Sequence, residues 1–199
     1  MIQPNIQCWR NIECWVENQY TKHMTSFLDP EKMTDALDIR PGMRLADFGS
    51  GHGYYAIPFA KRVGEKGKVY AFDVQEPAVE AVRAHAQASR CANVEARRVD
   101  LESDHGTGLH DNTIDVVFIA NIFFQAEDKP AIATEAYRIL APNSTAAVIE
   151  WQKTGAPLGP PPSLRLSPQE MEKIMTAVGF IKEREFDAGP WHYGIIFRK

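Results

Sequence analysis

The stretch 43-MRLADFGSGHGYYAIPFAKRVGEKGKVYAFD-73 decides how this chain folds. A short apolar run at 43–48 breaks into Gly49-Ser50-Gly51-His52-Gly53, and a helical pattern follows from Tyr54 to Val63. A second apolar run at 69–72 ends on Asp73. This order predicts a strand, a glycine turn, a helix, a strand and an acidic residue, which together form the first half of a nucleotide-binding βαβ unit.

The glycine turn indicates a ligand that lies against the main chain. Glycines at alternate positions let the backbone turn sharply, and they leave no side chain in the way of a ligand. The following helix begins with unpaired N–H groups and a positive dipole end. Asp73 lies at the sheet edge where ligands bind, so its carboxylate is placed to accept hydrogen bonds from a ribose diol. The alternative for Asp73 is a helix-cap carboxylate for the turn at 75–77.

The glycine spacing narrows the choice of ligand. A dinucleotide fingerprint needs a glycine where Tyr54 stands, and no P-loop lysine follows the turn. An ordinary βα turn is the simplest alternative. The motif Asp47-Phe48-Gly49-Ser50-Gly51-His52-Gly53 instead resembles the first motif of the class I S-adenosylmethionine-dependent methyltransferases. The acidic residue Asp73, in register after the second strand, strengthens this resemblance.

Hydrophobic patterning predicts the other elements. Helices are expected at 29–39, 75–89, 129–140 and 167–179, and strands at 93–99, 113–120, 144–150, 180–186 and 191–197. The last two strands surround Asp187-Ala188-Gly189-Pro190 and read as a hairpin. The resemblance covers about residues 30–199 and implies an α/β fold. It would be a doubly wound, mostly parallel seven-stranded sheet in the order 3-2-1-4-5-7-6, with an antiparallel C-terminal strand and helices on both faces.

The C-terminal third also resembles the small-molecule branch related to the quinone-biosynthesis C-methyltransferases. The residues that carry this finer resemblance are Gly159-Pro-Pro-Pro-Ser-Leu-Arg-Leu-Ser-Pro and Val178-Gly179-Phe180. The proline-rich linker at 153–166 is shorter than the substrate region that those enzymes usually carry.

The resemblance implies S-adenosyl-L-methionine as the cofactor and places its site beyond the carboxyl ends of the strands, where the strand order reverses. The expected cofactor-binding residues are Asp47, Gly49, Ser50, Gly51, Gly53, Asp73, Val74, Asp100, Leu101 and Asn121. Asp100 is expected to accept a hydrogen bond from the adenine amine, and its alternative is a solvated loop carboxylate. The expected substrate pocket consists of Asn121, Glu150, Trp151 and His192.

Methyl transfer needs an aligned nucleophile and exclusion of water more than it needs an acid or a base. Glu150 and His192 are weak candidates for a general base that would assist a protic acceptor. Their alternatives are a linker or helix-cap carboxylate for Glu150 and a surface turn residue for His192. The segment at 121–124 lacks the proline pair typical of enzymes that methylate amino groups of DNA and glutamine, so a small-molecule acceptor is expected. No residue selects carbon, oxygen, nitrogen or sulfur as the methylated atom.

Length, composition and charge restrict the classes of protein to which the chain can belong. The 199 residues, with 44% hydrophobic and 24% charged residues, suit a single domain at 1–199. A net charge of −4 disfavours broad nucleic-acid binding, and neither a signal peptide nor a membrane span is expected. The three cysteines have no paired spacing, which favours reduced thiols and a cytoplasmic location. Cys8 and Cys14 are six residues apart, a poor ligand spacing, so no metal site is expected.

Three further questions stay open. Residues 1–28 show a helical recurrence of apolar residues, which fits either a packing arm or a lid over the ligand. A nucleotide-dependent oxidoreductase is disfavoured by the glycine spacing. A catalytically silent S-adenosylmethionine-binding subunit or regulator would keep the glycine turn and lack a substrate pocket. The oligomeric state cannot be read from the sequence.

Overall fold

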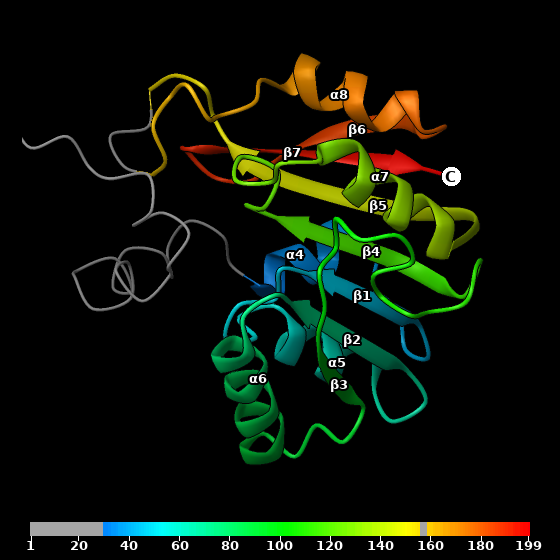
Figure 1. Ribbon diagram of the computed structural model, residues 1–199. Coiled ribbons are helices and arrows are strands. Elements are labelled where there is room, and N and C mark those ends of the chain that lie inside the picture. The colour runs from blue at the N-terminus through cyan, green and yellow to red at the C-terminus, as the bar shows by residue number, and fades with distance from the viewer. Residues whose placement is uncertain (1–29, 156–158) are drawn as a thin grey trace, which may run out of the picture.

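The computed structural model describes residues 30–155 and 159–199, and these residues form one seven-stranded sheet with helices on both faces (Figure 1). The strands are β1 (Arg44–Phe48), β2 (Lys68–Asp73), β3 (Val94–Arg98), β4 (Ile114–Ala120), β5 (Leu140–Trp151), β6 (Ile181–Asp187) and β7 (His192–Arg198). The helices are α4 (Pro30–Ala36), α5 (Ala56–Val63), α6 (Glu76–Ala88), α7 (Lys129–Ile139) and α8 (Pro168–Ala177). The predictions for the arm at 1–28, with Cys8 and Cys14, lie outside the described residues. That 1–199 is a single domain stays a prediction.

The strand order is β3-β2-β1-β4-β5-β7-β6, which confirms the predicted fold class. The neighbouring strands from β3 to β5 are parallel, whereas β7 is antiparallel to both β5 and β6. The arrowheads of β4 and β5 point to one side in Figure 1 and that of β7 points to the other. The start of β7 therefore lies at the same sheet edge as the ends of β4 and β5, which brings His192 beside Trp151 as expected.

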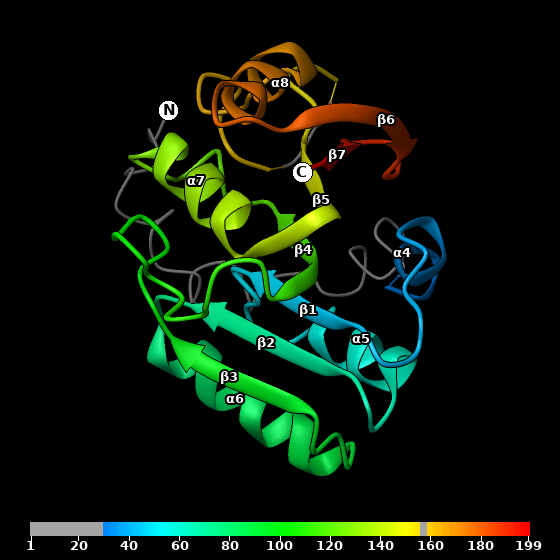
Figure 2. The same cartoon turned by 90° about the vertical axis from the view of Figure 1, so that its right-hand side faces the viewer.

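Two hydrophobic cores cover the two faces of the sheet (Figure 2). Because successive strand residues point to opposite faces, Ala147 and Ile149 of β5 pack in the core of α4, α5 and α6. Val148, between them, packs in the core of α7 and α8. Both faces of the central strands are buried, which explains the apolar run at 116–120 in β4.

The helix ends agree with the predicted ranges within two residues, with one exception. The Ser167 side chain accepts a hydrogen bond from the Glu170 N–H, and the Glu170 carboxylate accepts one from the Ser167 N–H, so α8 begins with a capping box. Gly179, just beyond this helix, has a φ of 111°. The exception is α4, which ends at Ala36 rather than at 39, because Asp38 has left-handed backbone with a φ of 50°.

The strand expected at 144–150 begins earlier. β5 starts at Leu140, which pairs with Ile114, and the register shifts before Thr145 pairs with Val116. Asn143, with a φ of 63°, has left-handed backbone and turns the chain at this point. The turn is therefore an irregularity within a strand rather than a separate connection.

The β3–β4 connection has no helix, as predicted, and it is tied to α7 by a buried carboxylate. The Glu135 side chain is 4% exposed, and its Oε1 accepts hydrogen bonds from the Thr107 N–H (3.0 Å) and from the Thr107 hydroxyl. Arg138 donates to both oxygens of Glu135 at 2.8 Å. The loop thus gains fixed partners without forming regular secondary structure.

Candidate cofactor and acceptor site

The glycine turn between β1 and α5 has the backbone that the sequence predicted. Gly49, Gly51 and Gly53 have φ values of 70°, 50° and 84°, a region that residues with a side chain rarely adopt. The N–H groups of Gly49 and Ser50 donate to the Phe72 carbonyl at 2.8 and 2.9 Å, which fixes the turn to the end of β2.

Space opens at the middle glycine only. A Cβ placed on Gly51 would meet no atom within 4 Å. A Cβ on Gly49 would lie 2.8 Å from the Ile122 side chain, and one on Gly53 would lie 3.3 Å from Val82. The outer glycines therefore allow close packing, whereas Gly51 leaves backbone exposed to a ligand.

Asp73 ends β2 and is buried at 6% exposure. Its Oδ2 accepts the Gly51 N–H at 2.9 Å, and its Oδ1 accepts the Gln75 N–H at 3.0 Å. Gln75 is the N-cap residue of α6, so the carboxylate supports both the glycine turn and the start of that helix. Each oxygen keeps further acceptor capacity, so the ribose role and the cap role are compatible.

Two polar side chains at the turn lack partners among the described residues. Asp47, at 2% exposure, and Ser50, at 7%, present a buried Oδ2 and a buried Oγ without a hydrogen bond. Burial, and secondarily the nearby charge of Asp73, raises the pKa of Asp47 to about 8. Buried polar atoms without partners are rare in folded proteins, and these lie beside the open backbone at Gly51. The residues present therefore fit a cofactor that places polar groups against this turn.

The next residues along the edge differ in exposure. Val74 is 56% exposed, an unusual position for an aliphatic side chain, and offers an apolar surface to a flat base. Asp100 is exposed, and its Oδ1 accepts the Glu102 N–H at 2.9 Å. Leu101 is buried in the core on the α7 side of the sheet. These three residues lie beyond the ends of β2 and β3, at the sheet edge where the cofactor was predicted to bind.

The turn after β4 lies between the expected cofactor residues and the expected acceptor residues. Asn121 has a φ of 57°, and its N–H donates to the Ile149 carbonyl at 2.9 Å. Its side-chain oxygen is buried without a partner among the described residues. Ile122 then packs on Gly49 of the glycine turn, so the two turns are in direct contact.

Glu150 is fully buried on β5, at 0% exposure. Its Oε1 accepts the Phe123 N–H at 2.7 Å, and its Oε2 has no partner among the described residues. Burial raises the pKa of Glu150 to about 8, although N–H groups of the adjoining turn, Phe123 foremost, oppose this effect. The carboxyl group is therefore mainly neutral at pH 7.

Trp151 and His192 pair across β5 and β7, with ring centroids 4.2 Å apart. His192 is 5% exposed, and both of its ring nitrogens are buried without a hydrogen-bond partner in the described part of the chain. Burial, followed by the charge of Arg165, lowers the pKa of His192 to about 4. The imidazole is thus neutral at pH 7 and keeps one donor and one acceptor.

The described part of the linker folds back over this pair. The Arg165 guanidinium lies 5.7 Å from the Trp151 ring centroid and donates to the carbonyls of Pro160 (2.8 Å) and Gln152 (3.1 Å). Gly159 packs closely against the Trp151 ring. A Cβ at this position would lie 2.7 Å from the ring, so the packing requires glycine. Figure 1 shows the linker passing beside the end of β5.

Sequence reasoning missed two residues of this region. Tyr193 pairs with Glu150 across β5 and β7, and its buried hydroxyl has no partner among the described residues. The sequence signal that could have identified Tyr193 is its position directly after His192 in a strand, where successive side chains point to opposite faces. Arg165, 4% exposed, stands between two leucines in the linker, and only the fold shows that its charge is buried.

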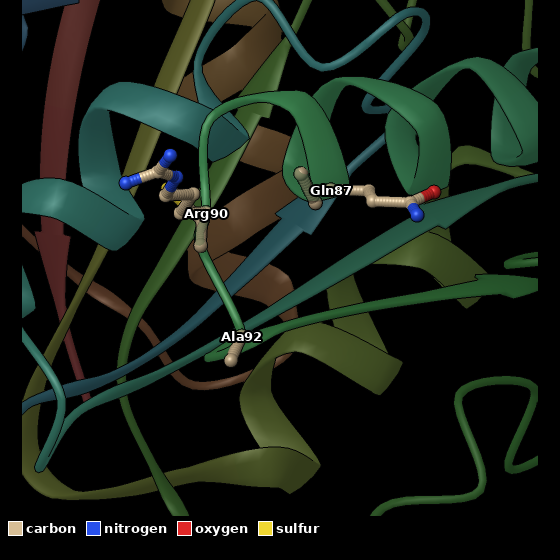
Figure 3. Close-up of a pocket in the computed structure, with 5 residues that line it drawn as sticks. Gln87, Arg90 and Ala92 are labelled. Carbon is tan, nitrogen blue, oxygen red and sulfur yellow. The ribbon is translucent and has the colours of Figure 1, made fainter.

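A hollow elsewhere on the surface is unrelated to this region. It is lined by Ala86, Gln87, Arg90, Cys91 and Ala92, where α6 ends and β3 is about to begin (Figure 3). That position is the amino end of β3, opposite the edge that carries the glycine turn. Within residues 30–155 and 159–199, no cluster of three or more His, Cys, Asp or Glu side chains is arranged to hold a metal ion.

The sequence matches a family model described as a methyltransferase domain over residues 39–183. Nocamycin O-methyltransferase of Saccharothrix syringae is 33% identical over 150 residues, which are 74% of this chain and 50% of that protein. A ubiquinone/menaquinone biosynthesis C-methyltransferase of Hydrogenovibrio crunogenus is 32% identical over 60% of this chain and 46% of its own length. The chain thus spans about half the length of these curated relatives.

A solved structure agrees over more of the chain. The crystal structure of a SAM-dependent methyltransferase from Aquifex aeolicus has a TM-score of 0.81 and 32% sequence identity. The match covers 87% of this chain and 91% of that one.

Proposed function

The chain belongs to the S-adenosylmethionine-dependent methyltransferases, and from this membership we propose that it transfers a methyl group to a small-molecule acceptor. S-adenosyl-L-methionine is the cofactor of this family and, when bound, supplies an activated methyl group on a sulfonium. The single observation that carries the proposal is the open backbone at Gly51, bordered by the unpartnered polar atoms of Asp47 and Ser50.

In this proposal, different residues contact chemically different parts of the cofactor. The glycine turn would approach the cofactor with backbone alone, and the unpartnered atoms of Asp47 and Ser50 would hydrogen-bond its polar groups. Asp73 would use its remaining acceptor capacity for the ribose hydroxyls, and Val74 would cover a face of the adenine. Asp100 would accept from the adenine amine, Leu101 would support the loop beneath it, and Asn121 would close the site toward the acceptor.

The acceptor would lie beyond the ends of β4, β5 and β7, against Asn121, Trp151 and His192. His192 is neutral at pH 7, so it can take a hydrogen bond, and finally the proton, from a protic acceptor. Its low pKa makes it a weak base, which suits an acceptor that gives up its proton only as the methyl group is transferred. Proximity and alignment can contribute ~7–11 kcal/mol to a displacement of this kind.

The linker supports a small acceptor rather than a macromolecule. Arg165 and Gly159 pack on Trp151, which narrows the space over the acceptor side. The finer assignment to the quinone-related branch is part of this proposal and is supported by the sequence similarity to a C-methyltransferase of that pathway. The odd cysteine count supports a cytoplasmic location, and the net charge of −4 supports the absence of broad nucleic-acid binding. No helix among the described residues has the length and apolar character needed to cross a bilayer.

Two measurements test the proposal. Calorimetry should detect binding of S-adenosylhomocysteine, and ligand at 100 times its Kd should stabilise the protein by about 2.7 kcal/mol. Incubation with methyl-labelled S-adenosylmethionine and a fractionated cell extract should then label a small molecule. The His192→Gln variant should keep binding S-adenosylhomocysteine and lose methyl transfer by about 100-fold or more.

The silent-subunit alternative gives a different result. Tight binding of S-adenosylhomocysteine without transfer to any extract fraction would favour a regulator. No binding of S-adenosylhomocysteine by folded protein would contradict the proposed function altogether.

A further inference from the structure

Three neighbouring strands each place an unpartnered polar atom at the carboxyl edge of the sheet. These atoms are Asn121 Oδ1 after β4, Glu150 Oε2 on β5 and the Tyr193 hydroxyl on β7, and we call the three residues the buried polar row. Glu150 and Tyr193 are a directly paired cross-strand couple. The Asn121 N–H donates to the Ile149 carbonyl, which places Asn121 next to Glu150.

A count of hydrogen-bond donors and acceptors shows which protonation state of Glu150 suits the buried polar row. The Asn121 oxygen is only an acceptor, and an ionised Glu150 would be only an acceptor as well, so the Tyr193 hydroxyl would be the one donor for two acceptors among the three unpartnered atoms of the row. A neutral Glu150 can accept the Phe123 N–H on Oε1 and offer a proton from Oε2 to Asn121, either directly or through a bridging water. The neutral acid is therefore the form that can satisfy the row.

The row is coupled to the cofactor turn by direct contacts. Glu150 holds the turn after β4 through the Phe123 N–H, and Phe123 is itself completely buried. The preceding residue of this turn, Ile122, packs on Gly49. A change at Glu150 thus reaches the glycine turn through two adjacent residues and one packing contact.

We infer that Glu150 is a positioning residue which, as a neutral carboxylic acid, holds the Asn121–Phe124 turn and the Asn121 carboxamide in the arrangement that binds the cofactor. This inference rests on the proposed function, because it assigns the turn to the S-adenosylmethionine site. It gives Glu150 a role other than that of a general base.

Glu150 is the residue of the buried polar row that titrates, as a comparison with the neighbouring ionisable groups shows. On β7 the facing group is Tyr193, whose pKa is raised by burial and by the charges of Glu150 and Glu170. On α8 the nearest acid, Glu170, is ion-paired with Lys153 at 2.8 Å, which lowers its pKa to about 2. The turn from Asn121 to Gln125 carries no ionisable side chain. Burial raises the pKa of Glu150 to about 8, so ionisation falls within an accessible pH range.

The test compares affinities for S-adenosylhomocysteine between pH 6.5 and 9.0 in the full chain, using wild type and Glu150→Gln. The glutamine amide keeps one acceptor and one donor at every pH, so it imitates the neutral acid. At pH 6.5 the two proteins should bind within about threefold of each other. By pH 9.0 the wild type should bind about tenfold more weakly than the variant, because about one Glu150 in eleven is then neutral. Titration of Asp47 affects both proteins and cancels in their ratio.

Glu65→Gln is the matched control, because Glu65 is exposed in the turn before β2, at the opposite edge of the sheet. It should follow the wild-type profile at every pH. Parallel profiles of wild type and Glu150→Gln would overturn the inference, as would a folded Glu150→Gln protein that binds more than about tenfold worse at pH 6.5. Wild type that binds no S-adenosylhomocysteine at any pH would overturn the proposed function and this inference together, whereas parallel profiles leave the proposed function intact.

Discussion

At the residue scale, Asp73 combines two tasks that the sequence presented as alternatives. Its carboxylate accepts N–H groups from Gly51 and from Gln75, so it stabilises the glycine turn and the start of α6 in the protein without ligand. The ribose role that we propose uses the remaining lone pairs of the same oxygens. One substitution is therefore expected to change both stability and affinity.

Asp73→Ala should lower the affinity for S-adenosylhomocysteine about 10–100-fold, through a net loss near 1.5–3 kcal/mol of charge-assisted hydrogen bonding. Loss of the cap contact should also cost ~0.5–2 kcal/mol of stability. Calorimetry and thermal melting on the same variant separate the two effects. Asp104→Ala, at a fully exposed loop carboxylate, is the control that should change neither quantity. A lowered melting temperature with intact affinity would limit Asp73 to the structural role.

Gly51 is the second residue for which a single change is decisive. Gly51→Val should abolish binding of S-adenosylhomocysteine while leaving the sheet folded, because the side chain would enter the open space over the turn. The positive φ adds a strain of roughly 1–2 kcal/mol, which lowers the melting temperature without unfolding the protein. Calorimetry and far-ultraviolet circular dichroism measure the two expectations. Unchanged affinity in the folded variant would remove this turn from the cofactor site.

At the element scale, the β3–β4 connection shows how a loop without regular structure is held in place. Its residues reach α7 through Glu135, which accepts from Thr107 and from Arg138. Burial alone would raise the pKa of Glu135, but hydrogen bonds from Arg138 and Thr107 outweigh it, so the pKa is lowered. The stabilisation is therefore present above the ordinary glutamate pKa and is lost as pH falls through the lowered value.

Glu135→Ala should destabilise the protein by about 3–5 kcal/mol, since removal of one partner leaves a mostly buried guanidinium. The lower end is expected, because Arg138 keeps Asp111 and the Leu109 carbonyl as partners. Urea unfolding measures the effect. Glu183→Ala breaks the half-exposed ion pair with Arg198 and should cost less than ~1 kcal/mol. Equal losses in the two variants would contradict the importance of the buried contact.

At the scale of the whole molecule, buried acids at the sheet edge that carries the glycine turn make the ligand-free protein less stable at alkaline pH. Asp47 and Glu150 both have a pKa near 8 in the folded chain, far above their ordinary values. The folded state therefore binds more protons than the unfolded state between pH 4 and pH 8, so stability declines as pH rises across that range. His192, with its pKa lowered to about 4, acts in the opposite sense between pH 4 and pH 6.5.

The melting temperature should therefore be highest near pH 5 or below and fall steadily toward pH 8.5, because the two acids outweigh the one histidine. Two groups with a pKa of about 8 would lose on the order of 5 kcal/mol between pH 6 and pH 8.5, which corresponds to roughly 10–20 °C in a protein of this size. Scanning calorimetry from pH 5 to pH 9 measures the curve, and Asp47→Asn combined with Glu150→Gln should flatten its alkaline side. A flat wild-type curve above pH 6 would contradict the raised pKa values of these two carboxyl groups.

The sequence by itself determined the order of elements and the place of the glycine turn, and its resemblance to the class I methyltransferases implied the sheet topology. The order of elements and the turn depend on signals within a few residues, such as the spacing of Gly49, Gly51 and Gly53. Strand alternation and the terminal hairpin then fixed which edge carries Trp151 and His192. The early start of β5 was missed because its pairing with Ile114 is made across the sheet rather than along the chain.

Only the tertiary structure decided the charge states and partners at the site. That Asp47 and Glu150 are buried, that Tyr193 faces Glu150 and that Arg165 covers Trp151 follow from contacts between residues far apart in the chain. The pKa of a carboxyl group depends on its desolvation and on neighbours from other strands, which no local pattern encodes. The sequence therefore predicted where a cofactor would bind, and the packing of β4, β5 and β7 decided which protonation states surround the predicted site.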